Sequence, residues 1–217
     1  RSNPTGKVFD EASIRGLSAI LSEKGREFRR EIFLISDEPY REIVYDDLKL
    51  PSVMQAYPHS FVASSYSKSL SLPGERIGYI AVNPDIADLD EVMNGLTLCN
   101  RILGFVNAPS LMQRAIAGLK GVKVDVETYR KKRDLLCDGL LSVGYRVTRP
   151  DGAFYLFPRT PIEDDVRFAE ALRRRRILTV PGSGFYGPGH IRIAFCVDDA
   201  TILGSIEGFG EALKEFR

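Results

Sequence analysis

Residues 61–68 of the chain are Phe61-Val62-Ala63-Ser64-Ser65-Tyr66-Ser67-Lys68. A short apolar run is followed by residues with hydroxyl groups and then by a lysine. The same pattern occurs earlier, where Ile32-Phe33-Leu34-Ile35 leads into Ser36-Asp37-Glu38-Pro39-Tyr40. Short continuous apolar runs of this kind are typical of strands that are buried on both faces of a sheet. A third strand is predicted near Ile77 to Val82. In the first two cases, side chains with hydroxyl, carboxylate or amine groups follow directly after the predicted strand.

Helices are predicted before and after these strands. Asp10 can cap a helix whose apolar side chains recur at helical spacing through about Lys24. From Ala108 to about Gly144 a long apolar stripe at helical spacing predicts one continuous helix that links two lobes. Helices that alternate with buried strands indicate an α/β sheet.

The remainder of the chain predicts a smaller α+β lobe. Strands are expected at residues 145–148, 153–158, 177–180 and 191–197, and helices at residues 163–176 and 198–216. We therefore expect residues 1–107 to form part of a large domain. Residues 108–217 would then form the long linking helix and a small C-terminal domain.

Composition favours a globular, cytoplasmic protein with a small-molecule partner. Apolar residues make up 44% of the chain and charged residues 27%, which is an ordinary globular balance. The chain has 30 basic and 29 acidic residues, so its net charge is close to zero. A long-range electrostatic attraction to nucleic acid or to an anionic membrane is therefore not expected. Three cysteines without a Cys-x-x-Cys pair indicate reduced thiols, and two histidines argue against a histidine-rich metal site. No apolar stretch approaches the roughly 20 residues of a membrane span.

Two of the polar residues fall where α/β sheets bind ligands. Ligands occupy the crevice beyond the carboxyl ends of the strands, and Asp37 and Lys68 both follow such an end. Neighbouring strands would bring them together. A lone lysine or aspartate after a strand is ordinarily a solvated surface residue, so a functional interpretation needs the whole set of motifs.

That set consists of four motifs in a fixed order. They are Asn3-Pro4-Thr5-Gly6, Asp37-Glu38-Pro39-Tyr40, Ser65-Tyr66-Ser67-Lys68 followed eight residues later by Arg76, and Ile191-Arg192-Ile193. In this order they resemble the class I/II aminotransferases, which depend on pyridoxal 5'-phosphate (PLP) and have fold type I. Any one motif is weak evidence, whereas four in order are specific. The resemblance implies part of the type I large domain, a mainly parallel sheet with flanking helices, together with a smaller α+β C-terminal domain.

The resemblance also implies a role for individual residues. Lys68 matches the lysine that holds PLP as a Schiff base and later moves a proton at the substrate α-carbon. Asp37 matches the carboxylate that keeps the pyridine nitrogen of the cofactor protonated. Tyr40 and Asn3 match the residues that contact its phenolic oxygen. A tyrosine at a strand end and an asparagine in a turn are the structural alternatives.

The remaining matches concern two anionic groups. Ser65, Ser67 and Arg76 surround Lys68 with hydroxyls and a guanidinium that suit the phosphate of PLP, and Ser65 and Arg76 match the family's phosphate ligands. Arg192, with Asn3, matches the site of the substrate α-carboxylate. The structural alternatives are a surface salt bridge for Arg76 and a solvent-facing strand residue for Arg192.

By resemblance, the function is that of a PLP-dependent aminotransferase (EC 2.6.1.-), which transfers an amino group between an amino acid and a 2-oxo acid in a homodimer. Two alternatives stay open, namely a PLP-dependent C–S or other lyase on the same fold, or a domain without activity of its own. A turn motif at the very start of the chain predicts that the N-terminal part of the family pattern is missing. Apolar strand faces and sheet edges would then be uncovered.

Overall fold

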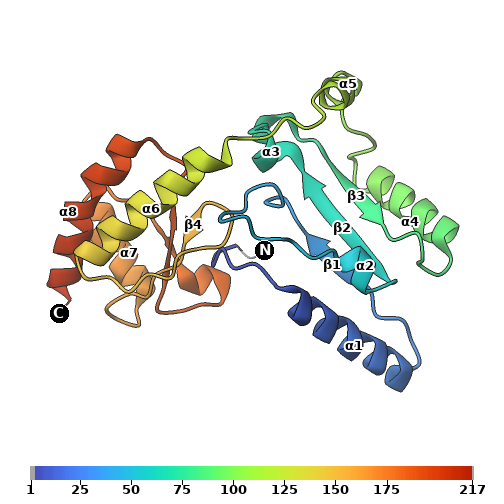
Figure 1. The fold of residues 1–217 in the computed structure, drawn as a ribbon, viewed down its shortest axis with the longest axis horizontal. Helices are drawn as coiled ribbons and strands as arrows, with labels where there is room; N and C mark the ends of the chain where they lie inside the picture. Colours follow the sequence, from blue (N-terminus) through green and yellow to red (C-terminus); the bar gives the residue numbers. More distant parts are fainter. Residues whose placement is uncertain (1–2, 217) are drawn as a thin grey trace. The chain divides into compact units, whose positions relative to one another are not determined.

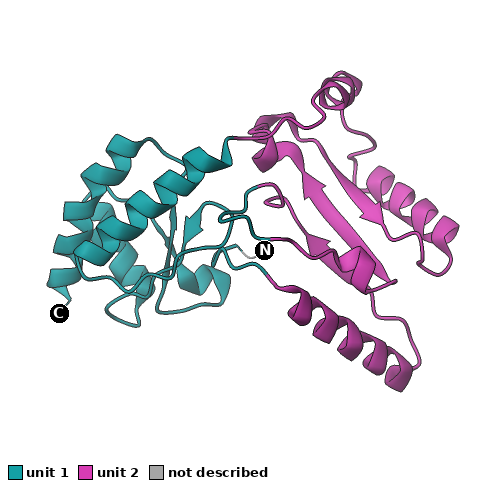
Figure 2. Ribbon diagram, in the orientation of Figure 1, with its two compact units in different colours: residues 1–8, 43–48, 125–217 teal, residues 9–42, 49–124 magenta. Residues whose placement is uncertain are grey.

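The computed structural model describes residues 3–216, and the chain folds as two compact units (Figure 2). Unit 1 contains the described parts of residues 1–8, 43–48 and 125–217, and unit 2 contains residues 9–42 and 49–124. The division expected from the sequence, between residues 107 and 108, concerns the domains of the family and stays a prediction. No helix in residues 3–216 is both long and apolar enough to cross a membrane.

Unit 2 begins with the helix expected after Asp10. This helix, α1 (Glu11–Phe28), is capped by the Asp10 carboxylate, which accepts a hydrogen bond of 2.8 Å from the backbone N–H of Ser13. The cap satisfies one of the N–H groups that the first helical turn leaves without a partner. At the other end Arg29 adopts a left-handed conformation and terminates the helix.

A three-stranded sheet follows, in the order β1 (Leu34–Asp37), β2 (Ser60–Ser65) and β3 (Gly78–Val82) (Figure 1). β1 and β2 run parallel, as expected for neighbouring strands, and β2 and β3 run antiparallel. The expectation that the first strand is buried on both faces is wrong for this structure, because Ile35 is 69% exposed. β1 is an outer strand whose ladder in the described chain is formed with β2 alone.

Further helices and one 3-10 turn complete unit 2. They are α2 (Val53–Ala56), α3 (Tyr66–Ser69), the 3-10 turn η1 (Pro73–Glu75), α4 (Leu89–Ile102) and α5 (Ser110–Gly118). Buried Asn83 holds the start of β2 to α2, because its side-chain amide donates to the carbonyls of Met54 and Tyr57 and to the hydroxyl of Ser60. A buried amide with several partners fixes one arrangement of the elements that it joins.

The single long helix predicted for residues 108–144 is wrong. The structure has two helices there, α5 and α6 (Val126–Ser142), separated by an irregular segment. Gly121 lies in that segment at φ +79°, a left-handed conformation that a helix cannot contain. Asp125 then starts α6 afresh, because its carboxylate accepts hydrogen bonds from the backbone of Glu127 and Thr128. The apolar stripe continues across the break, and only the left-handed backbone at Gly121 and the cap at Asp125 indicate that the helix is interrupted.

Unit 1 is the expected mixture of helices and short strands. Its antiparallel sheet has the order β4 (Tyr155–Leu156), β6 (Ile191–Ala194) and β5 (Val180–Pro181), and the 3-10 turn η2 (Gly182–Phe185) follows β5 directly. Helices α6, α7 (Asp165–Arg174) and α8 (Asp199–Glu215) pack around a core that contains Phe168, Phe195 and Phe209, each at most 1% exposed.

The strand predicted at residues 145–148 is also wrong. The backbone N–H of Tyr145 donates to the carbonyl of Leu140 at 3.0 Å and so completes the C-terminus of α6. Gly144, at φ +97°, provides the left-handed residue that such a helix end needs. The Tyr145 hydroxyl donates to the carbonyl of Phe209 in α8. Tyr145 therefore forms hydrogen bonds to α6 and α8, and residues 145–148 form no strand of the sheet.

Candidate functional site

Four of the predicted cofactor residues lie at or directly after the carboxyl ends of the parallel strands β1 and β2. Asp37 is the last residue of β1 and lies opposite Ala63 in the ladder. Ser65 is the last residue of β2, and α3, which contains Ser67 and Lys68, begins immediately after it. The expectation that neighbouring strand ends bring these side chains to one edge of the sheet agrees with this register.

Lys68 lies beside a buried aromatic ring. Its Nζ atom is 6.0 Å from the centroid of the Tyr40 ring, and Tyr40 is 7% exposed. A cation at this distance interacts with the negative face of a ring. The contact joins the turn after β1 to helix α3, which follows β2.

Arg76 is at the same end of the sheet. It ends η1 in a left-handed conformation, at φ +51°, and its Nη1 donates to the carbonyl of Pro73 at 2.8 Å. Two residues later Gly78 begins β3, directly opposite Ser65. The backbone of Arg76 is thereby held close to the residues that precede Lys68, and its exposed guanidinium retains in-plane N–H groups beyond the one bonded to Pro73.

The sequence interpretation missed the residue that organises the turn after β1. Glu38 is 7% exposed, and its carboxylate accepts hydrogen bonds from Ser36 Oγ at 2.9 Å and Arg41 Nη1 at 2.6 Å. Its carbonyl accepts a third from Ser64 Oγ at 3.1 Å. The turn that follows Asp37 is therefore tied to β2. A buried carboxylate needs such partners, but nothing in the sequence distinguishes Glu38 from an exposed glutamate.

An open hollow of about 270 Å³ lies next to this edge of the sheet. Glu38 and Ser65 line it from the strand ends, and Lys120 and Lys123 line it from the segment after α5. Lys68 is not among the lining residues. Polar and apolar side chains both line the hollow, which adjoins the predicted phosphate ligand Ser65 but does not include the predicted Schiff-base lysine.

The two predicted substrate residues meet in unit 1. Arg192 Nη1 on β6 donates to Asn3 Oδ1 at 2.9 Å, although 189 positions separate them in the sequence. The Arg192 guanidinium carbon lies 4.4 Å from the centroid of the Tyr155 ring and 4.5 Å from that of the Phe185 ring. With both rings close to it, the guanidinium offers its remaining N–H groups mainly in its own plane.

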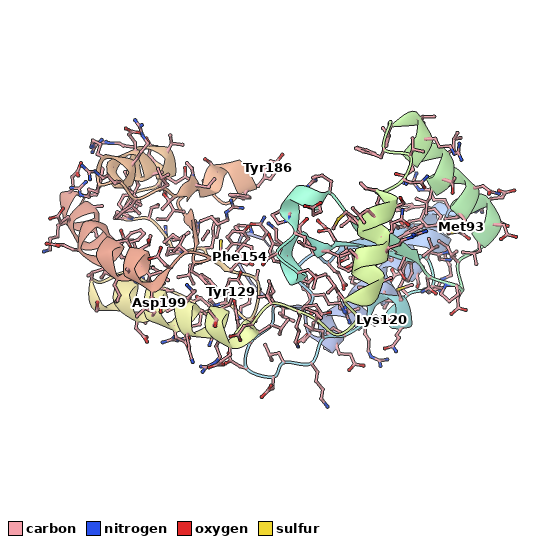
Figure 3. The ribbon with its side chains drawn as sticks, turned by 90° about the horizontal axis from the view of Figure 1, so that it is seen from above. Met93, Lys120, Tyr129, Phe154, Tyr186 and Asp199 are labelled. Carbon is pink, nitrogen blue, oxygen red and sulfur yellow. The ribbon has the colours of Figure 1, made fainter. Side chains whose placement is uncertain are left out.

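The aromatic partners of Arg192 were not predicted. Tyr155 lies on β4 and packs against Phe154, and Phe154 stacks on Tyr129 of α6 with 5.8 Å between ring centroids (Figure 3). Alternation along the strand at residues 153–158 would have suggested packed aromatic residues. It could not have shown that Arg192 lies against one of them, because the pairing of β4 with β6 is a tertiary feature.

The chemistry of these residues fits PLP. One carboxylate, one amine, two serine hydroxyls, a tyrosine hydroxyl and a guanidinium come from unit 2, namely Asp37, Lys68, Ser65, Ser67, Tyr40 and Arg76. PLP presents an aldehyde, a phenolic oxygen, a basic ring nitrogen and a phosphate dianion, and each has a complement of the right kind in this set. The role of each residue stays a prediction.

Comparisons with known proteins place the chain in a family. The sequence model of aminotransferase class I and II matches residues 1–207. A probable aspartate aminotransferase of Methanocaldococcus jannaschii is 34% identical over 217 residues, which cover 95% of this chain and 56% of that protein. The crystal structure of an aminotransferase from Eubacterium rectale superposes with a TM-score of 0.96 at 44% identity, over 100% of this chain and 54% of that one.

A second solved structure agrees. Aspartate aminotransferase from Thermotoga maritima has a TM-score of 0.82 at 27% identity, and the match covers 98% of this chain and 54% of that one. The chain thus spans about half the length of the relatives that it matches. Its α/β architecture is found in these enzymes, which have PLP fold type I. On the strength of the match over residues 1–207 and of these similarities, the chain belongs to the class I and II aminotransferase family.

Proposed function

We propose that this chain provides the lysine-bearing part of a PLP-dependent aminotransferase, which moves an amino group between an amino acid and a 2-oxo acid. The observation that carries the proposal is the placement of Lys68, directly after β2 and 6.0 Å from the Tyr40 ring, with Asp37 at the end of the adjacent parallel strand. The names of the relatives support it, since those named above are aminotransferases.

The residues of unit 2 would bind and orient the cofactor. PLP, when bound, supplies an electron sink for the pair that remains on the substrate α-carbon after a proton leaves. Lys68 would hold the cofactor through its side-chain amine, and as a free amine it would take the proton from the substrate α-carbon. The Asp37 carboxylate would favour a protonated ring nitrogen, and the Tyr40 hydroxyl would donate to the phenolic oxygen.

The phosphate of the cofactor would bind to hydroxyl and guanidinium donors. Ser65 and Ser67 offer hydroxyls on either side of the β2–α3 junction, and Arg76 offers a planar fork that matches two phosphate oxygens. These donors would hold the cofactor in place beside Lys68.

Arg192 would bind the α-carboxylate of the substrate. Tyr155 and Phe185 pack close to its guanidinium carbon, and the side-chain oxygen of Asn3 accepts a hydrogen bond from its Nη1, so these contacts limit its movement. The remaining N–H groups can then meet a carboxylate in fork geometry. Aspartate is the first amino acid to assay, because relatives are named aspartate aminotransferases. Assembly as a homodimer and a cytoplasmic location, both implied by the resemblance, belong to the same proposal.

The test is covalent trapping of the cofactor in the protein at its full natural length. After incubation with PLP and reduction with borohydride, peptide mass mapping should find the pyridoxyl adduct on Lys68, and Lys68→Ala should lose both the adduct and amino transfer from aspartate to a 2-oxo acid. Lys49→Ala removes an exposed lysine of the same unit that does not line the hollow beside Ser65, and serves as the control.

Two results would contradict the proposal. An adduct on surface lysines with none on Lys68 would remove Lys68 from the cofactor site. Consumption of an amino acid without any amino transfer to a 2-oxo acid would instead favour a PLP lyase.

A further inference from the structure

A buried carboxylate in unit 1 lies outside the set of predicted site residues. Asp165, the first residue of α7, is 3% exposed. Its Oδ2 accepts a hydrogen bond of 2.6 Å from the backbone N–H of Ser183, 18 residues further along the chain. A carboxylate removed from water requires strong donors, and here a backbone N–H of η2 provides one.

The segment held by Asp165 has little conformational freedom. The N–H of Gly182 donates to the carbonyl of His190 at 2.8 Å, and the N–H of Gly187 returns to the carbonyl of Gly182 at 2.9 Å. A Cβ atom on Gly182 would collide with the carbonyl oxygens of both Gly187 and His190. The backbone of η2 therefore follows one tight path, and the bond from Ser183 to Asp165 fastens it to α7.

This path determines where Phe185 lies. Phe185 is two residues beyond Ser183, at the end of η2, and its ring packs 4.5 Å from the guanidinium carbon of Arg192. Phe157 meets the same ring edge-on, with 6.5 Å between centroids. A displacement of η2 would move the Phe185 ring off Arg192 and let the guanidinium tilt away from Tyr155.

We propose that Asp165 is a positioning residue for substrate binding, which acts through Ser183 and Phe185 to hold the guanidinium of Arg192 in the plane required by a carboxylate. The proposal rests on the proposed function, in which Arg192 binds the substrate α-carboxylate. Asp165 itself does not contact that carboxylate and takes no part in the chemistry.

A purely structural role at the start of α7 is the competing explanation, and the neighbouring residue separates the two. Asp164 is the N-cap of α7, because its Oδ1 accepts a hydrogen bond of 2.9 Å from the backbone of Arg167. Asp164 is exposed, and its carboxylate contacts α7 instead of η2. Loss of Asp164 should therefore weaken the helix without disturbing Phe185.

The experiment measures KM and kcat for the amino acid substrate in the protein at its full natural length, with PLP bound. Asp165→Ala should raise KM about tenfold, because it leaves a buried N–H without an acceptor and frees η2, and should change kcat much less. Asp165→Asn should restore most of the affinity, since its amide oxygen can still accept from Ser183. Asp164→Ala should lower the thermal midpoint but leave KM unchanged.

Phe185→Leu keeps the test decisive even if Asp165→Ala fails to fold. It removes the ring from Arg192 and should raise KM to a similar extent, because the guanidinium loses the ring contact that Asp165 is proposed to keep in place. An unchanged KM in Phe185→Leu, or equal KM values in Asp165→Ala and Asp164→Ala, would overturn the inference.

Arg192→Lys distinguishes this failure from failure of the proposed function. If Arg192→Lys raises KM while Asp165→Ala does not, only the positioning role is wrong. If Arg192→Lys leaves KM unchanged, Arg192 does not bind substrate and the proposed substrate site is wrong as well.

Discussion

At the scale of single residues, the turn that carries Lys68 depends on a close backbone approach. Gly78 lies opposite Ser65 in the β2–β3 ladder. A Cβ atom on Gly78 would lie 2.5 Å from the carbonyl oxygen of Ser64 and 3.1 Å from the Cα of Ser65. Both of those atoms belong to the backbone, so relief would require the two strands to separate immediately before α3.

We predict that Gly78→Ala lowers the free energy of unfolding by about 1–3 kcal/mol, the usual cost of forcing extra volume into a packed position. Gly74→Ala is the matched control, because a Cβ there meets no atom within 4 Å and its φ is not in the left-handed range. That change should be neutral or slightly stabilising, since alanine restricts the unfolded chain. Urea denaturation of both variants is the measurement, and equal midpoints would contradict the packing argument.

At this scale the sequence could identify candidate residues that belong to a motif. It could not identify residues whose role depends on contacts between distant parts of the chain. The order of the motifs was sufficient to nominate Lys68 and Arg192. It could not nominate Glu38, Phe185 or Asp165, because the donors and rings that define their environments come from other elements. Burial of a charged side chain depends on how the elements pack, and no periodic pattern in the sequence predicts it.

At the scale of elements, the starts of the first and last helices were predictable, and the interruption before α6 was not. Asp10 and Asp198 both cap helices through a backbone N–H three residues later, which is a local interaction that the sequence displays. The break after α5 depends on the left-handed backbone at Gly121, within an apolar stripe that continues on both sides. Hydrophobic periodicity therefore predicted one helix where the backbone makes two.

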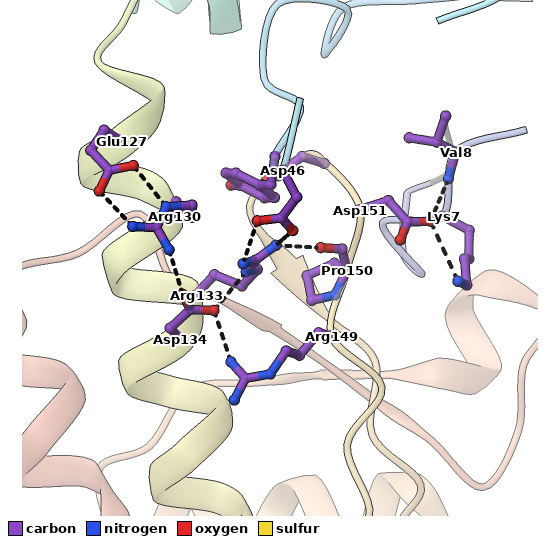
Figure 4. A network of polar contacts seen from close by, with 12 residues as sticks. Lys7, Val8, Asp46, Glu127, Arg130, Arg133, Asp134, Arg149, Pro150 and Asp151 are labelled. Carbon is purple, nitrogen blue, oxygen red and sulfur yellow. Dashed lines mark hydrogen bonds and ion pairs between the residues drawn. The ribbon is translucent and has the colours of Figure 1, made fainter. Parts of the chain in front are cut away.

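One loop is held to α6 by ionic contacts inside unit 1 (Figure 4). The side chain of Arg133, which is 5% exposed, donates to Asp46 at 2.7 and 3.3 Å and to the carbonyl of Pro150 at 3.3 Å. Its Nε donates to Asp134, which also binds Arg149. A buried guanidinium is stable only while such partners remain ionised or hydrogen-bonded.

The pH dependence of stability should reflect this contact. The hydrogen bond from Arg133 holds the pKa of Asp46 below its ordinary value. A carboxylate with a lowered folded-state pKa stabilises the fold above its unfolded pKa of about 3.9, and that contribution is lost as pH falls through the folded pKa. We therefore predict that Asp46→Asn reduces stability at pH 7 and flattens the loss of stability in acid.

The measurement is the free energy of unfolding by urea at pH values from about 6 down to 2, across the range in which carboxylates with lowered pKa values titrate. Asp47→Asn makes the same chemical change one residue further along the exposed loop and is the control. The assignment to Asp46 fails if both variants follow the wild-type curve, or if Asp47→Asn flattens it equally.

At the scale of the whole molecule, the sheet of unit 2 has two outer strands with apolar side chains in solvent. β1 and β3 flank β2, and Ile35 on β1 and Ile80 on β3 are 69% and 55% exposed. Exposed apolar outer strands present unpaired N–H and C=O groups as templates for another strand. The expectation that strand faces and edges are uncovered agrees with this arrangement, in a chain that spans about half the length of its relatives.

We predict that the 217-residue chain self-associates through the edge of β1, and that Ile35→Lys reduces this association because lysine on an outer strand opposes edge-to-edge pairing. Leu111→Lys is the control, since Leu111 is 75% exposed but lies on helix α5. Both variants remove an exposed apolar side chain and add one positive charge, so only strand pairing separates them. Light scattering after size exclusion, over a range of protein concentrations, should give a lower average mass for Ile35→Lys alone. Equal reduction by both variants would instead indicate general apolar adhesion, and no change in either would exclude β1 as the contact.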